Sequence, residues 1–167
     1  TPSSVITDKS CNKKYPLTDY ALTPTVAIVD PEFVMSLPAA IAADTGIDVL
    51  THAVEAYVSI LASDFTDGWA KQAVKLVFDY LEESVKEGTP LSREKMHNAS
   101  CLAGIAFDKV SLGINHSIAH AIGAKFHISH GRANSLLLVH VIDYNSQIKG
   151  YKTIEFSETA KKYAEIS

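Results

Sequence analysis

The stretch that decides the fold lies at residues 44–55 and reads DTGIDVLTHAVE. It belongs to an apolar-rich segment, residues 45–62, in which aliphatic residues recur every three or four positions. These are Ile47, Leu50, Val54, Val58 and Leu61. Such spacing predicts a long helix with one apolar face. Asp48 and His52 are four residues apart, so both side chains share a helix face and can reach one cation. Glu55 could orient a ligand, but we expect it to be solvated, as glutamates on helices usually are.

Helical patterns continue along most of the chain. Pro31 and Pro38 are each placed to open a helix, because proline is tolerated in the first turn. Residues 64–69, DFTDGW, are predicted to interrupt the helical pattern, and Ser92 is predicted to cap a later helix. Further helices are predicted at residues 67–87, 92–107, 115–124, 130–145 and 157–167.

The first thirty residues differ from the rest. Residues 4–7 and 25–29 are short β-branched runs that predict strands, and residues 8–13 form a polar turn between them. The fold class predicted from these patterns is mainly α, with a short β-containing lead. The chain starts without Met and closes on a helical pattern without a stop signal, so we expect a fragment of a longer protein.

The composition excludes several classes of protein. Apolar residues make up 47% of the chain, which argues against disorder. The formal net charge is −4, and nucleic-acid binding is not expected without a basic excess. No apolar run approaches the roughly 20 residues that cross a bilayer, so a membrane role is not expected either. Two cysteines and no visible signal peptide favour a reduced, cytoplasmic protein.

Histidines and one aspartate are the candidate chemical groups. Residues 115–120, NHSIAH, place two histidines four apart on a predicted helix, and residues 126–131, FHISHG, place another at a loop-to-helix junction. The candidates are Asp48, His52, His116, His120, His127 and His130. An Asp–His ion pair and hydrogen-bonded core imidazoles are the structural alternatives. Three segments with candidate ligands together favour a single metal site.

Such a ligand set limits the chemistry. A carboxylate with imidazoles suits Fe(II) or Zn(II), and Ni, Co and Mn stay open. A cation with an open position would polarise a substrate oxygen as a Lewis acid. The chain has no P-loop, nucleophile elbow or GxGxxG motif, so the main binding site of any redox cofactor must lie elsewhere.

Three motifs resemble one family. GIDVLTHAVEAYVS at 46–59, AGIAFDKVSLGINHSIAHAIGA at 103–124 and FHISHGRANSLLL at 126–138 resemble the iron-containing (group III) alcohol dehydrogenases. Residues 17–34 and 55–68 look most like the alcohol dehydrogenase half of the bifunctional acetaldehyde–alcohol dehydrogenases. The resemblance implies the dehydroquinate-synthase-like fold of this family. Residues 1–30 would then be a remnant of the N-terminal α/β cofactor domain, and residues 31–167 a C-terminally incomplete helical metal-binding domain.

The resemblance also assigns roles to residues. The implied metal ligands are Asp48, His52, His116 and His130. His120 would lie near the nicotinamide and substrate in a polar or proton-relay role, and so would not be a ligand. Phe107 matches an aromatic residue that lines the same pocket, and Lys14 matches a lysine near the cofactor. His127 could line the site, but the motif fixes no role for it.

The function implied is the interconversion of a primary alcohol and an aldehyde, such as ethanol and acetaldehyde, with NAD(H). The metal would be Fe(II), with Zn possible, and the fragment alone is expected to be inactive. The alternatives are a metal-dependent hydrolase or lyase that uses the same histidines, and a non-catalytic helical assembly module. The resemblance implies a homo-oligomer or filament for the full-length protein.

Overall fold

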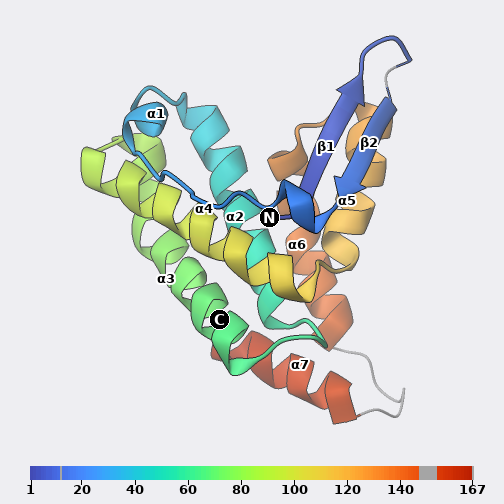
Figure 1. The fold of residues 1–167 in the computed structure, drawn as a ribbon. Coiled ribbons are helices and arrows are strands. Elements are labelled where there is room, and N and C mark those ends of the chain that lie inside the picture. The colour runs from blue at the N-terminus through green and yellow to red at the C-terminus, as the bar shows by residue number, and fades with distance from the viewer. Residues whose placement is uncertain (12, 147–153, 167) are drawn as a thin grey trace.

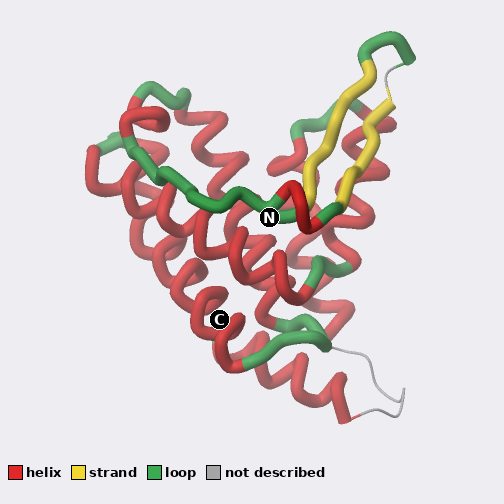
Figure 2. The backbone as a smooth tube through the Cα atoms, in the orientation of Figure 1, coloured by secondary structure: helices red, strands yellow, loops and turns green. Residues whose placement is uncertain are grey.

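The computed structural model describes residues 1–11, 13–146 and 154–166, and it is mainly helical (Figures 1 and 2). A two-stranded sheet precedes the helices. The elements in chain order are β1 (Ser3–Asp8), β2 (Lys13–Thr18), η1 (Tyr20–Leu22), α1 (Glu32–Met35), α2 (Ala39–Tyr57), α3 (Asp64–Lys86), α4 (Pro90–Val110), α5 (Ile114–Phe126), α6 (His130–Ser146) and α7 (Ile154–Glu165). Within the described ranges, every helix is too short or too polar to cross a lipid bilayer.

The β-containing lead is a hairpin. β1 and β2 pair antiparallel, with Ser3 opposite Thr18 and Asp8 opposite Lys13. This confirms the strand predicted at residues 4–7. The strand predicted at residues 25–29 is wrong, because no described strand lies beside that segment. It runs as an extended connection past α4 to α1, as Figure 2 shows. Val26 and Ile28 are 72% and 84% exposed there.

The predicted break at residues 64–69 is also wrong. Ser63 and Thr66 form a capping box, in which each side chain accepts from the other's backbone N–H, so α3 already begins at Asp64. The chain turns earlier, between Tyr57 and Ser63. α4 likewise begins before the predicted cap. Thr89 is its N-cap and accepts from the backbone N–H of Ser92, and Pro90 occupies the first turn.

The core lies where α2, α3 and α4 pack together (Figure 1). Small buried residues line these contacts and let the helices approach closely: Ala53, Ala73, Ala99 and Ala103 are each at most 1% exposed. α6 packs against α2, and α5 packs against α6. The close approach of α6 to α2 depends on Gly131, because a Cβ at this position would lie 2.0 Å from the backbone oxygen of Asp44. This packing brings the beginnings of α5 and α6 against the middle of α2.

Candidate metal centre

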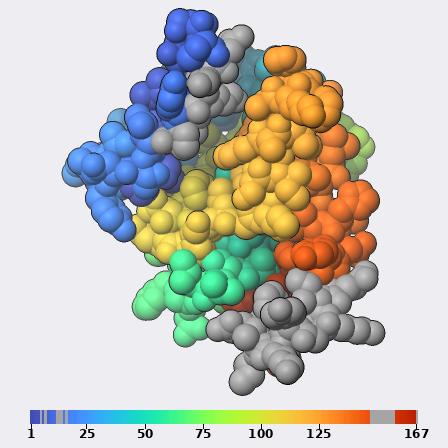
Figure 3. All heavy atoms as spheres, turned by 90° about the vertical axis from the view of Figure 1, so that its right-hand side faces the viewer, coloured from blue at the N-terminus to red at the C-terminus, as the bar shows by residue number. Residues whose placement is uncertain are grey.

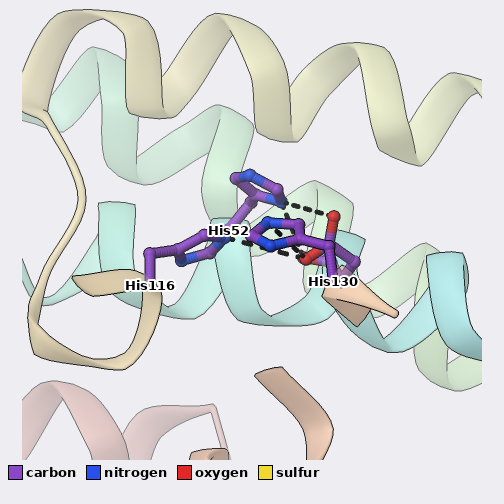
Figure 4. A group of neighbouring side chains, drawn as sticks. His52, His116 and His130 are labelled. Atoms are coloured by element: carbon purple, nitrogen blue, oxygen red, sulfur yellow. Dashed lines mark hydrogen bonds and ion pairs between the residues drawn. The ribbon is translucent and has the colours of Figure 1, made fainter. Parts of the chain in front are cut away.

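Three helices bring the four predicted ligands to one place. Asp48 and His52 lie one turn apart on α2, His116 lies in the first turn of α5, and His130 is the first residue of α6. One ligand atom from each of the four side chains lies within 4.8 Å of the others. Figure 4 shows the three imidazoles converging. In Figure 3, α5 and α6 form much of the face that is shown, in shades of orange, with the end of α4 next to them.

The separations within the cluster fit a cation better than direct hydrogen bonds. Oδ1 of Asp48 lies 3.7 Å from Nε2 of His116 and 3.6 Å from Nε2 of His130. A hydrogen bond between these atoms would be about 2.7–3.2 Å long. Two ligands that are each about 2.1 Å from a tetrahedral cation lie roughly 3.4 Å apart. Nε2 of His116 is buried and has no hydrogen-bond partner within the described chain. Buried polar atoms usually have a partner, so this nitrogen is available to bind a metal ion.

Hydrogen bonds to the ligands direct their lone pairs. Nδ1 of His52 lies 2.8 Å from the backbone carbonyl of Asp48. A carbonyl only accepts, so Nδ1 carries the proton and Nε2 of His52 keeps its lone pair. Nδ2 of Asn134 donates to Oδ1 of Asp48 at 2.5 Å and lies 3.2 Å from Nε2 of His130. The same amide therefore contacts two of the candidate ligands.

The protonation of the cluster follows from burial and neighbouring charge. Burial, helped by the charge of His116, lowers the pKa of His52 to about 4, so this imidazole is neutral around neutral pH. Burial is the largest single effect and would raise the pKa of Asp48, but His116, His52, Asn134 and His130 together lower it. Burial likewise opposes protonation of His116, but the carboxylates of Asp48 and Glu55 prevail and raise its pKa. A cation would compete with a proton for His116.

The other predicted site residues lie at different distances from the cluster. The ring of Phe107 stacks on His52, with centroids 4.8 Å apart and 28° between the planes. His120 is exposed, and its ring centroid lies 5.0 Å from that of His130 and 6.4 Å from that of His116. His127 is the exposed C-cap of α5, in the left-handed region at φ 55°. Lys14 lies in β2, and its side chain is outside the described part of the structure.

Three buried polar residues around the cluster were not expected. Glu55 is only 4% exposed, so its predicted solvation is wrong. Asn115 and Asn134 are fully buried, and the amide of Asn115 donates to Oδ1 of Asn134 at 2.9 Å. For Glu55 and Asn134, the sequence spacing from a candidate ligand is the signal that could have indicated their place near the cluster. Glu55 lies seven residues after Asp48, and Asn134 lies four after His130, so each shares a helix face with a ligand.

Three helices thus gather a carboxylate and three imidazoles whose ligand atoms lie close enough together to hold a single metal ion. A family described as "Fe-containing alcohol dehydrogenase family, C-terminal" matches residues 42–167. The chain therefore belongs to the Fe-containing alcohol dehydrogenase family, and the matched residues correspond to its C-terminal part. This agrees with the resemblance carried by the sequence motifs.

Individual relatives agree with the family match. An aldehyde-alcohol dehydrogenase of Streptococcus pneumoniae is 64% identical over 145 residues, which cover 87% of this chain and 16% of that protein. The chain thus spans about a sixth of this relative. The iron-containing alcohol dehydrogenase of Thermococcus thioreducens superposes with a TM-score of 0.88 at 34% identity, over 99% of this chain and 41% of that one. The sulfoacetaldehyde reductase of Bifidobacterium kashiwanohense, solved with NAD⁺, superposes with a TM-score of 0.84 at 34% identity. The match covers 99% of this chain and 47% of that one. These neighbours confirm the predicted dehydroquinate-synthase-like fold of the family.

Proposed function

We propose that this chain is the metal-binding part of an NAD-dependent alcohol dehydrogenase that interconverts a primary alcohol and its aldehyde, such as ethanol and acetaldehyde. The observation that carries the proposal is the cation-sized gap between Asp48 and the imidazoles of His116 and His130. Family membership supports the reaction class. The name of the S. pneumoniae relative supports an alcohol and an aldehyde as substrates, and the NAD⁺ complex of a structural neighbour supports the cofactor.

The residues that would hold the metal are Asp48, His52, His116 and His130. The family description favours Fe(II), and Zn(II) suits the same donors. When bound, the cation supplies Lewis acidity toward the oxygen of an alcohol or aldehyde. The protein holds His52 neutral by burial and fixes its proton on Nδ1, so this ligand is ready to bind without losing a proton.

Phe107 and His120 have complementary roles in the proposal. Phe107 covers one face of His52 and excludes water from that side of the cluster, where it would also contact a nicotinamide ring. His120 lies at the exposed edge of the cluster, from which an imidazole can pass a proton between the site and solvent. Lys14 is proposed to contact the cofactor, and this assignment rests on the sequence resemblance alone.

The proposal also covers the longer protein of which this chain would be a part. Residues 1–30 would belong to the α/β cofactor domain and residues 31–167 to the helical catalytic domain, in a cytoplasmic homo-oligomer or filament. The chain alone is then expected to bind metal without dehydrogenase activity. A metal-dependent hydrolase and a purely structural module are not favoured, because the matching family consists of dehydrogenases.

The experiment is metal analysis of the purified chain after incubation with Fe(II) under anaerobic conditions, or with Zn(II). We expect close to one ion per chain, and a loss of most bound metal in Asp48→Asn and His116→Ala. His140→Ala, which removes an exposed histidine of α6 outside the cluster, is the matched control and should keep its metal. Undiminished metal in both ligand variants would remove the assignment. The reaction is tested by NAD-linked oxidation of ethanol by the longer protein with the same substitutions.

A further inference from the structure

We propose that Glu55 is a positioning residue: its carboxylate fixes both the tautomer of His116 and the start of the helix that carries it. The inference rests on the proposed metal site and concerns a residue outside the ligand set. One buried side chain of α2 would thereby set the tautomer and the position of a ligand that α5 contributes.

The contacts of Glu55 are specific. Oε2 lies 2.6 Å from Nδ1 of His116, and Oε1 accepts the backbone N–H of Asn115 at 2.8 Å. The side chains of Glu55 and His116 are each only 4% exposed. A carboxylate buried so deeply is costly unless it is paired and hydrogen-bonded, and here both oxygens have a partner. Glu55 therefore contacts two neighbouring residues in the first turn of α5.

The contact with Asn115 replaces a missing helix cap. Gly113 is the N-cap of α5 and has no side chain to accept from the first turn. Oε1 of Glu55 takes that place, and its negative charge is favourable at a helix N-terminus. A Cβ at position 113 would lie 2.7 Å from Oε1 of Glu55. Glycine therefore leaves the space through which the carboxylate reaches the helix.

The contact with His116 determines which ring nitrogen keeps the lone pair. A carboxylate that accepts from Asn115 on one oxygen accepts from Nδ1–H of the imidazole on the other. The proton of neutral His116 then stays on Nδ1, and Nε2 keeps its lone pair. Nε2 faces Oδ1 of Asp48 across 3.7 Å, where the cation would lie.

Glutamine at this position creates a conflict that tests the inference. With its oxygen on the N–H of Asn115, the amide nitrogen of the glutamine faces Nδ1 of His116 and requires Nδ1 to accept. With the amide turned over, two N–H donors face each other at the start of α5. We expect the first arrangement, because the displaced proton on Nε2 would then point toward the carboxylate of Asp48. His116 would be in the tautomer that does not bind metal through Nε2.

The test compares the wild type with Glu55→Gln. Nitrogen-15 spectra of the metal-free proteins in alkaline buffer, where the imidazoles are neutral, report which ring nitrogen of His116 carries the proton. We expect Nδ1–H in the wild type and Nε2–H in Glu55→Gln. Competition with a chromophoric chelator for Zn(II) should show affinity about 10- to 100-fold weaker in the variant. Glu55→Asp keeps the charge but is one methylene shorter, and should recover part of the affinity.

Thr51→Val is the matched control. Thr51 is fully buried on the same helix, and its hydroxyl donates only to the carbonyl of Ile47 at 2.8 Å in the described hydrogen bonds. It should change stability without changing the His116 tautomer or the affinity for Zn(II). An unchanged tautomer together with wild-type affinity in Glu55→Gln would overturn the inference and leave the metal site in place. Failure of the wild type to bind metal would instead overturn the proposed function, while the tautomer result would still decide the role of Glu55.

Discussion

The side-chain amide of Asn134 donates a hydrogen bond to Oδ1 of Asp48 at 2.5 Å from a fully buried position on α6. The carbonyl oxygen of the same amide accepts from Asn115, so one side chain joins α2, α5 and α6. Buried amides of this kind hold a carboxylate in one rotamer. The orientation of the candidate ligand Asp48 therefore depends on a residue that would not itself touch the metal.

We predict that Asn134→Ala weakens Zn(II) binding by about 10- to 100-fold, because Asp48 loses its donor. The variant also leaves the amide of Asn115 short of a partner, which costs roughly 1–3 kcal/mol of stability. Zn(II) competition and urea unfolding measure the two effects separately. Wild-type affinity in a folded Asn134→Ala protein would contradict the proposed role of this amide.

Gly131→Ala should be strongly destabilising. Its new Cβ would lie 2.0 Å from the carbonyl oxygen of Asp44 and 2.5 Å from the carbonyl carbon, and backbone cannot rotate away as a side chain can. We expect a loss of at least about 2 kcal/mol in the free energy of unfolding, or a displaced α6 with weaker metal binding through His130. Gly68→Ala is the control, because nothing lies within 4 Å of its Cβ. Gly68→Ala should be neutral or stabilising by up to about 1 kcal/mol, since alanine favours the helix.

Metal should stabilise the chain against heat. A ligand that binds only the folded state contributes about 2.7 kcal/mol when its concentration is 100 times its Kd. We predict that Zn(II) raises the melting temperature of the wild type, that a chelator reverses the shift, and that His52→Ala largely abolishes it. Calorimetry with and without metal provides the measurement. An equal shift in His52→Ala would show that the cation binds elsewhere.

The attachment of α7 should be sensitive to acid. Hydrogen bonds from Tyr57 and Lys71 lower the pKa of Glu165, and Lys162 on the same helix pairs with Asp67 at 2.7 Å. Because the folded-state pKa is lowered, the contribution of Glu165 is present above its unfolded pKa and is lost as the pH falls through the folded value. Hydrogen exchange in α7 should therefore accelerate in acid, and Glu165→Gln should remove much of that pH dependence. Exchange in α4, which contributes no residue to these pairs, is the internal reference.

Local patterns predicted most of the helices. The three- and four-residue periodicity around Val54 and the proline at position 38 indicated α2, although the helix ends at Tyr57, before the predicted limit. The start of α3 was misplaced because aspartate and glycine in residues 64–69 suggested a turn. The capping box of Ser63 and Thr66 instead makes them the first turns of a helix. The run at 25–29 has strand composition, but a strand also needs a neighbour to pair with, and composition says nothing about that.

The candidate ligands were predictable for a different reason. Histidines and an aspartate at helical spacing are visible in one segment at a time, and the family motifs selected four of them. Their supporting residues were not predictable, because the burial of Glu55 and Asn134 depends on how α5 and α6 pack against α2. The spacing of Glu55 from Asp48 shows that both share a face. It does not show that another helix covers that face.

The apolar cluster in which α2, α3 and α4 pack contains none of the four candidate ligands. By contrast, α5 contacts α2 through Glu55, and a shared ion would add a second connection. The direct contacts between α5 and α2 are thus a few polar ones, whereas α5 also packs against α6, and α6 packs against α2. If the proposed ion binds there, its removal would leave α5 joined directly to α2 through the described contacts of Glu55, with the contact of α2, α3 and α4 unchanged. We therefore expect metal-free protein to stay folded and to bind the ion again when it is supplied.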